Sequence, residues 1–375
     1  MPGVRVPMRL CLFTPVFLPY IGGAEVAMDA LARQFGDLGH HVVVLAKGKP
    51  AVLGVPYPVR WASRPRAERF FPERIAKPLV NLHHREHFDL IFSPYTHPTG
   101  HAAVMVADQL HVPVVIGSQG GDLYHSSKHR ARAHLWKRTI HACRHADGLV
   151  AISPHMEQLI REICPEPRRL AQIPNGVDLE QYTAPSTRPH DFQDQRPFVL
   201  CLGNIGPMKG FDHAVEAFAK VRRQMEGTAL VIVGDGPLRG KIERLVKDHQ
   251  LESDVLLPGT RHGAEKRWFL QHCRFGLMPS IEEGLPLVAL EFMASARPLI
   301  CTTNASFDGL VEEGQNGHRV PAGQPTELAE ALLRMNGADL QSMGAEGQRR
   351  VADYDWARIA PRYIEFFEQV CRSRG

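Results

Sequence analysis

Short apolar runs alternate with longer amphipathic stretches along the whole chain. The strand-like runs are RLCLFTP, HVVVLA, LIFSP, VPVVIG and GLVAIS in the first half, and FVLCLGN, ALVIVG, VLLPG, FGLMPS and RPLICTT in the second. Apolar runs of this length, separated by helix-length segments, are typical of parallel sheets that helices cover on both faces. The pattern therefore predicts an α/β fold built from βαβ units.

The length of the chain favours two domains. A single core rarely serves more than about 250–300 residues, and this chain has 375. The polar segment YTAPSTRPHDFQDQRPF contains Pro185, Pro189 and Pro197, and is the linker that we expect. We predict two doubly wound Rossmann-like domains, at 1–184 and 198–354, which face each other across a cleft. Because ligands bind at the carboxyl ends of the strands in such sheets, the active site is expected in that cleft.

The composition is that of an ordinary globular protein, with 44% hydrophobic and 22% charged residues and a net charge of +4. Its seven cysteines show no paired spacing, so neither a disulfide framework nor a zinc site is indicated, and a reducing cytoplasm is expected. The first residues contain Pro15 and Pro19 and predict a strand, not a secretion signal. No apolar run reaches the roughly 18 residues of a membrane-spanning helix.

Basic residues gather at 60–77 and 128–144, and we interpret both clusters as solvated surface. The segment ERFFPERIAKPLVNLHHREHF adds aromatic side chains, which leaves open a peripheral contact of the first domain with the inner face of an anionic membrane. Pro72 and Pro78 argue against a continuous amphipathic helix there. No nucleic-acid partner is expected.

The segment PSIEEGLPLVALEFMASARPLI is the most informative part of the second half. A strand that ends at Met278 leads through a polar loop into a helix, and Pro286 suits the first helical position because it lacks an amide hydrogen. The free amides of Leu287 and Val288, together with the helix dipole, then predict an anion site beyond the end of the strand.

Two carboxylates flank this predicted anion site. Glu283 lies just outside the helix, and Glu291 lies about one turn inside it on a side chain that leans back toward the start. A carboxylate repels an anion, so the useful partners are hydroxyl groups: a ribose diol for Glu291 and sugar hydroxyls for Glu283. The alternative is that Glu283 only complements the helix dipole and that Glu291 is merely exposed.

A second loop carries a cation and glycines. In FVLCLGNIGPMKGFDHAVEAFAKV a strand and a glycine-rich loop precede a helix that starts near Phe211, and Lys209 at the end of the loop can reach a diphosphate. The alternative is a solvated lysine. In ALVIVGDGPLRGKIERL, Gly234 and Gly236 superficially resemble a dinucleotide fingerprint, but the next glycine comes one residue late, so we interpret the segment as a tight turn.

The first half offers a face for an acceptor. Gly22 and Gly23 precede a helix, which lets the backbone approach a ligand closely, although a simple turn would also use glycines. VVIGSQGGDLYHS places Gln119 and Asp122 after another strand, where either side chain could orient an acceptor hydroxyl. Asp122 could equally cap a helix.

No metal site is predicted. His141 and His145 are four residues apart in a helix-like segment, but the glutamate of a zinc-hydrolase motif is missing, and we interpret the pair as surface or packing residues. Asp353 and Asp355 form a D-x-D pair, and Asp355 precedes Trp356 at a helix start, where capping is the expected role.

Together, these motifs resemble the family 4 retaining glycosyltransferases of GT-B fold, and the resemblance covers nearly the whole chain. PYIGGAE is similar to the first glycine-rich loop of the family, IPNGVD to its interdomain signature, GNIGPMKG to its G-R-L-x-x-x-K-G loop, and EEGLPLVALE to its E-x7-E pair. YDWARIAPRYIEFFEQV resembles the terminal helix that crosses back to the first domain, so 355–375 is expected to be that helix.

The resemblance implies transfer of a hexose-type sugar from a UDP-, GDP- or ADP-sugar to an acceptor hydroxyl in a glycan or lipid-linked acceptor, with no metal. Lys209 would hold the diphosphate, Glu291 the ribose and Glu283 the sugar or its phosphate, so Lys209 and Glu283 are the catalytic candidates. The donor-binding candidates are Gly23, Asn204, Lys209, Glu283, Gly284, Leu287, Val288 and Glu291. The acceptor-binding candidates are Gly22, Gln119 and Asp122.

Four features, at five positions, depart from the family pattern. Asn204 replaces the arginine that usually partners the lysine, so that a nearby cation such as Arg261 would have to compensate. Gln119 replaces a histidine, and Ala296 replaces a glycine. Ala305 and Ser306 stand where glycines are expected. The Asn204 change keeps a weakly catalytic sugar-nucleotide binding protein as an alternative, and the glycines at 234 and 236 keep an NAD-type oxidoreductase.

Overall fold

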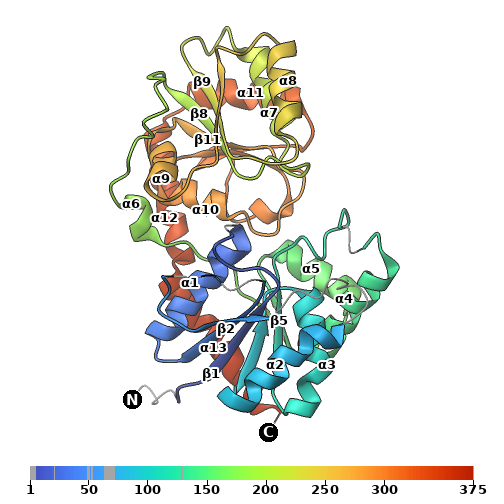
Figure 1. Cartoon of the computed structure of the whole chain (residues 1–375). Coiled ribbons are helices and arrows are strands. Elements are labelled where there is room, and N and C mark those ends of the chain that lie inside the picture. Colours follow the sequence, from blue (N-terminus) through green and yellow to red (C-terminus); the bar gives the residue numbers. More distant parts are fainter. Residues whose placement is uncertain are drawn as a thin grey trace. The chain divides into compact units, whose positions relative to one another are not determined.

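The chain forms two compact units (Figure 1). The structure, a computed structural model, describes residues 6–20, 22–48, 51, 54–62, 72–127 and 130–374. Unit 1 comprises residues 1–176 and 356–375, and unit 2 comprises residues 177–355. The chain thus enters unit 2 ahead of the proline-rich segment that was expected to link the domains.

Unit 1 contains a parallel sheet of seven strands in the order β3-β2-β1-β4-β5-β6-β7. Strands β4, β5 and β6 are buried along their whole length, and β1 and β2 are buried after their first residue, which explains their apolar sequences. The strands are β1 (Arg9–Thr14), β2 (His41–Lys47), β3 (Val59–Ala62), β4 (Leu90–Ser93), β5 (Val114–Ser118), β6 (Gly148–Ala151) and β7 (Leu170–Gln172).

The helices of unit 1 are α1 (Gly23–Asp37), α2 (Pro72–Glu86), α3 (His101–Leu110), α4 (Ala133–His145), α5 (Pro154–Ile163) and α13 (Trp356–Arg372), with a short turn of π-helix at Thr96–Gly100. Helix α2 is continuous through Pro78, so the prediction that Pro72 and Pro78 interrupt a helix there is wrong. Pro72 begins α2, where no amide partner is needed, and Pro78 is accommodated inside the helix. Residues 63–71 and 128–129 of the two basic clusters lie outside the described residues.

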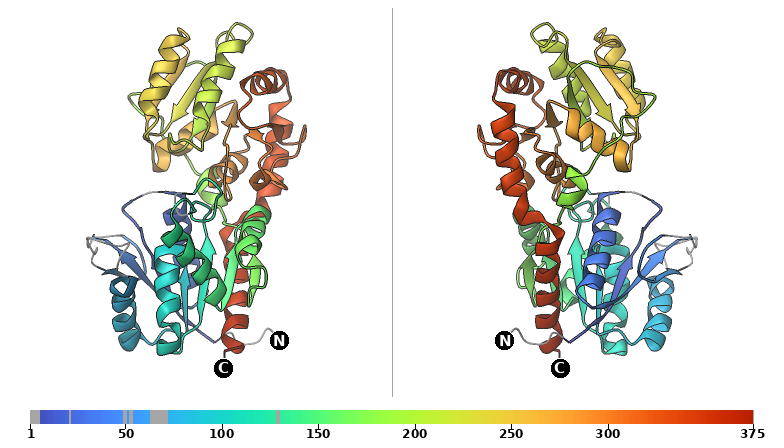
Figure 2. Two further views of the ribbon diagram at one scale, coloured as in Figure 1. Left: turned by 90° about the vertical axis from the view of Figure 1, so that its right-hand side faces the viewer. Right: turned by 90° about the vertical axis from the view of Figure 1, so that its left-hand side faces the viewer.

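The C-terminal helix α13 packs on unit 1, along whose side it runs in Figure 2. Its aromatic side chains meet those of α1 and β4: the ring centroids of Phe35 and Phe367 are 5.8 Å apart, and those of Phe92 and Phe367 are 5.5 Å apart. Beyond the helix, Arg374 forms ion pairs with Asp108 and Asp147, both at 2.6 Å. The predicted return of the C-terminal helix to the first domain is confirmed.

Unit 2 contains a parallel sheet of six strands in the order β10-β9-β8-β11-β12-β13. The strands are β8 (Phe198–Leu202), β9 (Ala229–Val233), β10 (Val255–Gly259), β11 (Phe275–Met278), β12 (Leu299–Thr302) and β13 (Gly317–Val320). The helices are α6 (Leu179–Thr183), α7 (Phe211–Val221), α8 (Arg239–Asp248), α9 (Gly263–His272), α10 (Leu287–Ala294), α11 (Pro325–Asn336) and α12 (Leu340–Val351), with single 3₁₀ turns at Ala305–Phe307 and Ala352–Tyr354.

The segment expected as a linker is packed into unit 2. The ring of Phe192 is buried, and its centroid lies 4.9 Å from that of Phe269 in α9. The guanidinium of Arg188 lies 5.1 Å from the ring centroid of Trp268. These apolar contacts fix the segment, because burying aromatic rings outweighs the preference of its prolines and polar residues for solvent.

The strand order is equivalent in the two sheets. In each sheet the chain first adds strands on one side of the first strand, and then returns to add the remaining strands on the other side. The order reverses between β1 and β4 in unit 1 and between β8 and β11 in unit 2. At such a point the loops after the two central strands leave in opposite directions and open a crevice at the carboxyl edge. The predicted fold class, two doubly wound α/β domains, is confirmed.

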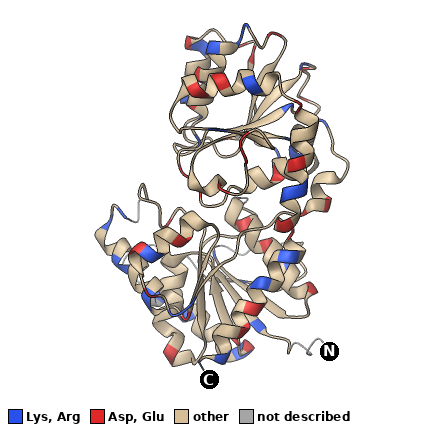
Figure 3. Cartoon of the chain, turned by 180° about the vertical axis from the view of Figure 1, so that it is seen from behind, with Lys and Arg blue, Asp and Glu red and all other residues tan. Residues whose placement is uncertain are grey.

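The surface carries both signs of charge. Figure 3 shows Lys and Arg interspersed with Asp and Glu on the helices of each unit. Among the described residues, no helix has the length and apolar character needed to cross a bilayer.

The end of α10 shows why glycine is usual at position 296. Ala296 has φ +52°. The amide of Ala296 donates to Met293 O (3.0 Å), and that of Arg297 donates to Phe292 O (2.9 Å). This is the Schellman ending, whose left-handed residue is normally glycine because a Cβ is strained there.

We expect Ala296→Gly to stabilise unit 2 by about 0.5–1 kcal/mol, since relief of the left-handed strain exceeds the extra entropy of the unfolded chain. The measurement is hydrogen exchange of core amides in unit 2. Ala219→Gly, inside α7 in ordinary helical conformation, is the matched control and is expected to destabilise by about 1 kcal/mol. Equal effects of the two substitutions would contradict the strain at Ala296.

A group of histidines packs between α3 and α4 in unit 1. The rings of His101 and His141 have centroids 5.1 Å apart, and those of His141 and His145 are stacked at 4.1 Å. Burial, followed by the charges of His141 and Arg138, lowers the pKa of His101 from 6.5 to about 4. The prediction that His141 and His145 are surface or packing residues agrees with this geometry, since His141 is half-buried against His101 and His145 is exposed.

We expect the free energy of unfolding of unit 1 to fall as the pH drops from about 6.5 to about 4. The unfolded chain binds a proton at His101 near pH 6.5, whereas the folded chain does so only near pH 4, so acid favours unfolding by at most about 3 kcal/mol. Denaturant unfolding across this range should show a weaker pH dependence for His101→Asn. The control is His134→Asn, which changes an exposed histidine of α4. If His101→Asn kept the wild-type pH dependence, His101 would not be the group responsible for the loss of stability in acid.

Candidate functional site

The loops after β8 and β11 meet at the point where the strand order of unit 2 reverses. The amide of Ile281 donates to Met208 O at 2.8 Å. Gly210 has φ +63°, and a Cβ there would lie 2.1 Å from Pro279 O. Only glycine therefore permits this approach of the two loops.

Lys209 and Glu283 form an ion pair across this contact. Lys209 Nζ lies 2.5 Å from Glu283 Oε1, and Ser280 Oγ donates to the same oxygen at 2.9 Å. The hydroxyl of Ser306 donates to the carbonyl oxygen of Glu283. The carboxylate is thus fixed through its side chain and its backbone, while 27% of the Lys209 side chain remains exposed. The structure brings together these two predicted catalytic candidates.

Helix α10 begins at Leu287, within the predicted onset. Pro286 is the N-cap, with φ −76° and ψ +98°, and not the first helical residue as predicted. The difference is one position, because the extended ψ keeps Pro286 outside the helix. The amides of Leu287 and Val288 belong to the first turn, which has no intrahelical acceptors for them. They remain candidates for binding an anion.

Glu291 is buried and not exposed, so the second half of the alternative for the two glutamates is wrong. Its Oε1 accepts from Lys266 Nζ of α9 at 2.6 Å, and its Oε2 has no hydrogen-bond partner among the described residues. Burial, followed by the charge of Glu291 and a hydrogen bond to its carboxylate, raises the pKa of Tyr182 on α6, so the phenol stays protonated and donates to Glu291. The carboxylate is therefore held by Lys266 and Tyr182, and its Oε2 is shielded from solvent.

The glycines after β9 serve to pack two loops together. A Cβ on Gly234 would lie 1.8 Å from Gly203 O, and one on Gly236 would lie 2.4 Å from Asn204 Oδ1. The close packing of these two loops agrees with the predicted tight turn. Asn204 is exposed on the loop and adds no charge. Arg261, the suggested compensating cation, pairs with Asp191 at 2.6 Å.

In unit 1 the strand order reverses between β1 and β4, and Gly22 and Gly23 lie at the end of the loop that follows β1. Gly22 is the N-cap of α1, and the buried carboxylate of Glu25 accepts from its backbone amide and from the hydroxyl of Tyr95, which follows β4. Burial raises the pKa of Glu25, although these hydrogen bonds oppose the shift. The amide of Gly22 donates to the carboxylate of Glu25, so it is not free to bind a ligand, and the start of this helix carries a carboxylate instead.

Gln119 and Asp122 lie in different environments. Gln119 Oε1 accepts from Asn175 Nδ2 at 2.9 Å, which connects QGGD to the IPNGVD motif. Asp122 is buried, and its carboxylate accepts from the amide and hydroxyl of Thr96 (2.7 and 2.6 Å) and from Ser118 Oγ (2.7 Å). Asp122 therefore fixes the start of the turn at Thr96–Gly100, and no helix begins directly after Asp122, so the local helix cap offered as its alternative role is wrong.

Three further residues belong to these sites, and sequence reasoning did not select them. Lys266 and Ser306 reach the two glutamates from α9 and from the 3₁₀ turn after β12, and Glu25 occupies the start of α1. The signal for Glu25 was present in GGAE, next to the two glycines. Among the described residues, no group of three His, Cys, Asp or Glu side chains is arranged to hold a metal ion.

Comparisons with known proteins agree with this architecture. Residues 21–181 match the family model described as Glycosyltransferase Family 4, and residues 196–336 match the one described as Glycosyl transferases group 1. The chain belongs to the family 4 glycosyltransferases and has the GT-B fold.

The similar proteins extend over nearly the whole chain. An uncharacterized glycosyltransferase of Methanocaldococcus jannaschii is 25% identical over 96% of this chain and 98% of its own. N-acetyl-alpha-D-glucosaminyl L-malate synthase of Bacillus anthracis is 22% identical, with coverage of 95% and 96%. The structure of Anabaena HepE with UDP and glucose has a TM-score of 0.81 at 18% identity, and covers 96% of this chain and 100% of HepE.

We expect Lys266→Met to lower the free energy of unfolding of unit 2 by about 2 kcal/mol, because the buried carboxylate of Glu291 loses its cation. Combining it with Glu291→Gln should recover part of the loss, and urea unfolding of the single and double variants measures both. Lys220→Met, which removes an exposed lysine from α7, should change stability by less than about 0.5 kcal/mol. Strictly additive effects at 266 and 291 would contradict the pairing.

Proposed function

We propose that this glycosyltransferase moves a hexose-type sugar from a nucleotide-diphosphate sugar to an acceptor hydroxyl, with retention of configuration and without a metal, in the synthesis of a glycan, glycolipid or polysaccharide. The observation that carries the proposal is the Lys209–Glu283 pair at the strand-order reversal of unit 2. UDP and glucose, the ligands of Anabaena HepE, indicate the kind of donor.

The contacts of unit 2 support a distinct role for each donor group. The partly exposed ammonium of Lys209 and the first-turn amides of α10 suit the diphosphate. The carboxylate of Glu291, one turn inside α10, is the group proposed to accept from a ribose hydroxyl. Glu283, held by Ser280 and Ser306, is suited to accept from hydroxyls of the sugar. The donor nucleotide would be a UDP-, GDP- or ADP-sugar.

The reaction needs orientation and charge stabilisation more than a protein nucleophile. The bond between the anomeric carbon and the diphosphate oxygen breaks, the acceptor oxygen bonds to the same face, and the leaving phosphate takes the acceptor proton. Negative charge grows on the diphosphate as that bond breaks. Lys209 and the amides of α10 stabilise this charge, and this interaction strengthens as the transition state is approached.

We expect release of nucleoside diphosphate from one member of a panel of UDP-, GDP- and ADP-sugars, in EDTA, with a suitable acceptor present. Lys209→Ala and Glu291→Ala should reduce this rate at least about 100-fold, in the range seen when a preorganised charge partner is removed. Lys220→Met, with the same loss of one positive charge at a distance from the loops, should retain the rate.

Other outcomes identify the alternatives. Tight donor binding without turnover would favour a sugar-nucleotide binding protein, to which the neutral Asn204 points. Activity that EDTA abolishes and manganese restores would overturn the metal-free part of the proposal. Binding of NAD(H) in place of any sugar nucleotide would favour an oxidoreductase.

A further inference from the structure

A hollow lies in unit 2 at the amino ends of β11 and β12, at the edge of the sheet opposite to their carboxyl ends. Its volume is about 540 Å³. Arg274, directly before β11, and Arg297, two residues before β12, line it together with His272 at the end of α9. Because Lys209 and Glu283 follow the carboxyl ends of β8 and β11, this hollow is separate from the candidate donor site.

The two arginines have no carboxylate partner among the described residues. Arg274 Nη2 donates to Asn336 O at 3.2 Å, and its Nη1 donates to the Asn336 side chain and to Thr228 Oγ1. Arg297 Nη2 donates to Gln271 O, and its Nε is buried without a hydrogen-bond partner in the described part of the chain. Each arginine therefore caps the end of a helix, α11 or α9, which offsets only about half of a positive charge.

Helix α12 supplies the other wall. Gln341, Ala345 and Gln348, on one face of the helix, are exposed into the hollow, and Leu340 adds an apolar surface at the first helical position. The positive end of the α12 dipole is thus at the same place as the two arginines. Asp339, the adjacent acidic residue, accepts from the amide of Ser342 as the N-cap of α12.

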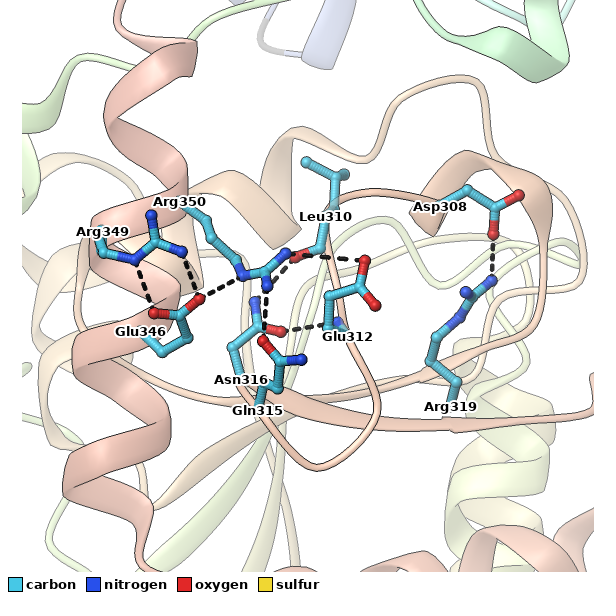
Figure 4. A network of polar contacts seen from close by, with 9 residues as sticks. All are labelled: Asp308, Leu310, Glu312, Gln315, Asn316, Arg319, Glu346, Arg349 and Arg350. Carbon is cyan, nitrogen blue, oxygen red and sulfur yellow. Dashed lines mark hydrogen bonds and ion pairs between the residues drawn. The ribbon is translucent and has the colours of Figure 1, made fainter.

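A network at the far end of α12 holds this wall in place (Figure 4). Arg350 Nε and Nη2 donate at 2.7 Å to Glu346 Oε1 and Gln315 Oε1, respectively. Asn316 Nδ2 donates to Leu310 O, and Asn316 Oδ1 accepts from the amide of Glu312, both at 2.8 Å. The hollow therefore lies against a braced helix.

We propose that this hollow binds a small organic phosphate with an apolar body. The phosphate would take the remaining Nη donors of Arg297 and the Nη2 donor of Arg274 that Asn336 leaves over, since guanidinium groups match phosphate oxygens in geometry and charge. The apolar body would lie against Leu340, Ala296 and Ala345. No acidic side chain lines the hollow among the described residues. A dianion therefore meets positive charge that the helix ends only partly offset.

The test is calorimetric titration of the full chain with phenyl phosphate, which is close to a dianion above pH 7. We expect saturable binding, at least ten-fold tighter than that of benzoate. Gln341→Glu places a negative charge in the hollow and removes no hydrogen bond described for the fold, so it should weaken binding at least ten-fold. Gln158→Glu makes the same change at an exposed position of α5 in unit 1 and should leave the binding of phenyl phosphate unchanged.

Lys209→Ala separates the two candidate anion sites. Phenyl phosphate should bind this variant within two-fold of wild type if the hollow is its site. Loss of binding in Lys209→Ala with retention in Gln341→Glu would place the ligand at the donor loops and overturn the proposal. Absence of binding to the wild-type chain would also overturn it, and benzoate that binds as tightly as phenyl phosphate would overturn the assignment of a phosphate.

Discussion

The contact between the loops after β8 and β11 positions the charged groups of the candidate site in unit 2. The Ile281–Met208 hydrogen bond and the approach of Gly210 to Pro279 bring Lys209 within 2.5 Å of Glu283. Separating two partly buried charges from water is costly, and the geometry of the pair and the hydroxyl of Ser280 offset that cost. The pair exists because parallel strands that reverse order direct two loops to one crevice.

Periodicity predicts the fold well because parallel strands buried on both faces require continuous apolar runs, as in the sequences that became β8 and β11. It fails where tertiary packing overrides local composition. Phe192 and Arg188 hold the proline-rich segment against α9, and Pro78 is tolerated inside α2. Neither the aromatic contact nor the local adjustment around a proline is visible in a polar or proline-rich stretch.

The same distinction applies to the candidate site. Lys209, Glu283 and the start of α10 could be located because strand ends and helix starts leave signals in adjacent residues. Lys266 and Ser306 could not, because they reach the glutamates from separate elements of the fold. Asp122 shows the converse: its position after a strand indicated a ligand, but Thr96 and Ser118 occupy its carboxylate. A short polar residue at a strand end is equally suited to bracing a turn.

The two units carry different groups at equivalent loops. Unit 2 presents Lys209, paired with Glu283, together with first-turn amides at its order reversal, and these donors suit a diphosphate. Unit 1 presents the buried carboxylate of Glu25, next to Tyr95, with the Gly22 amide already used. A carboxylate there repels phosphate and accepts from hydroxyls. This asymmetry within one repeated architecture supports the proposed donor site in unit 2, because the charged groups and not the topology distinguish the two strand-order reversals.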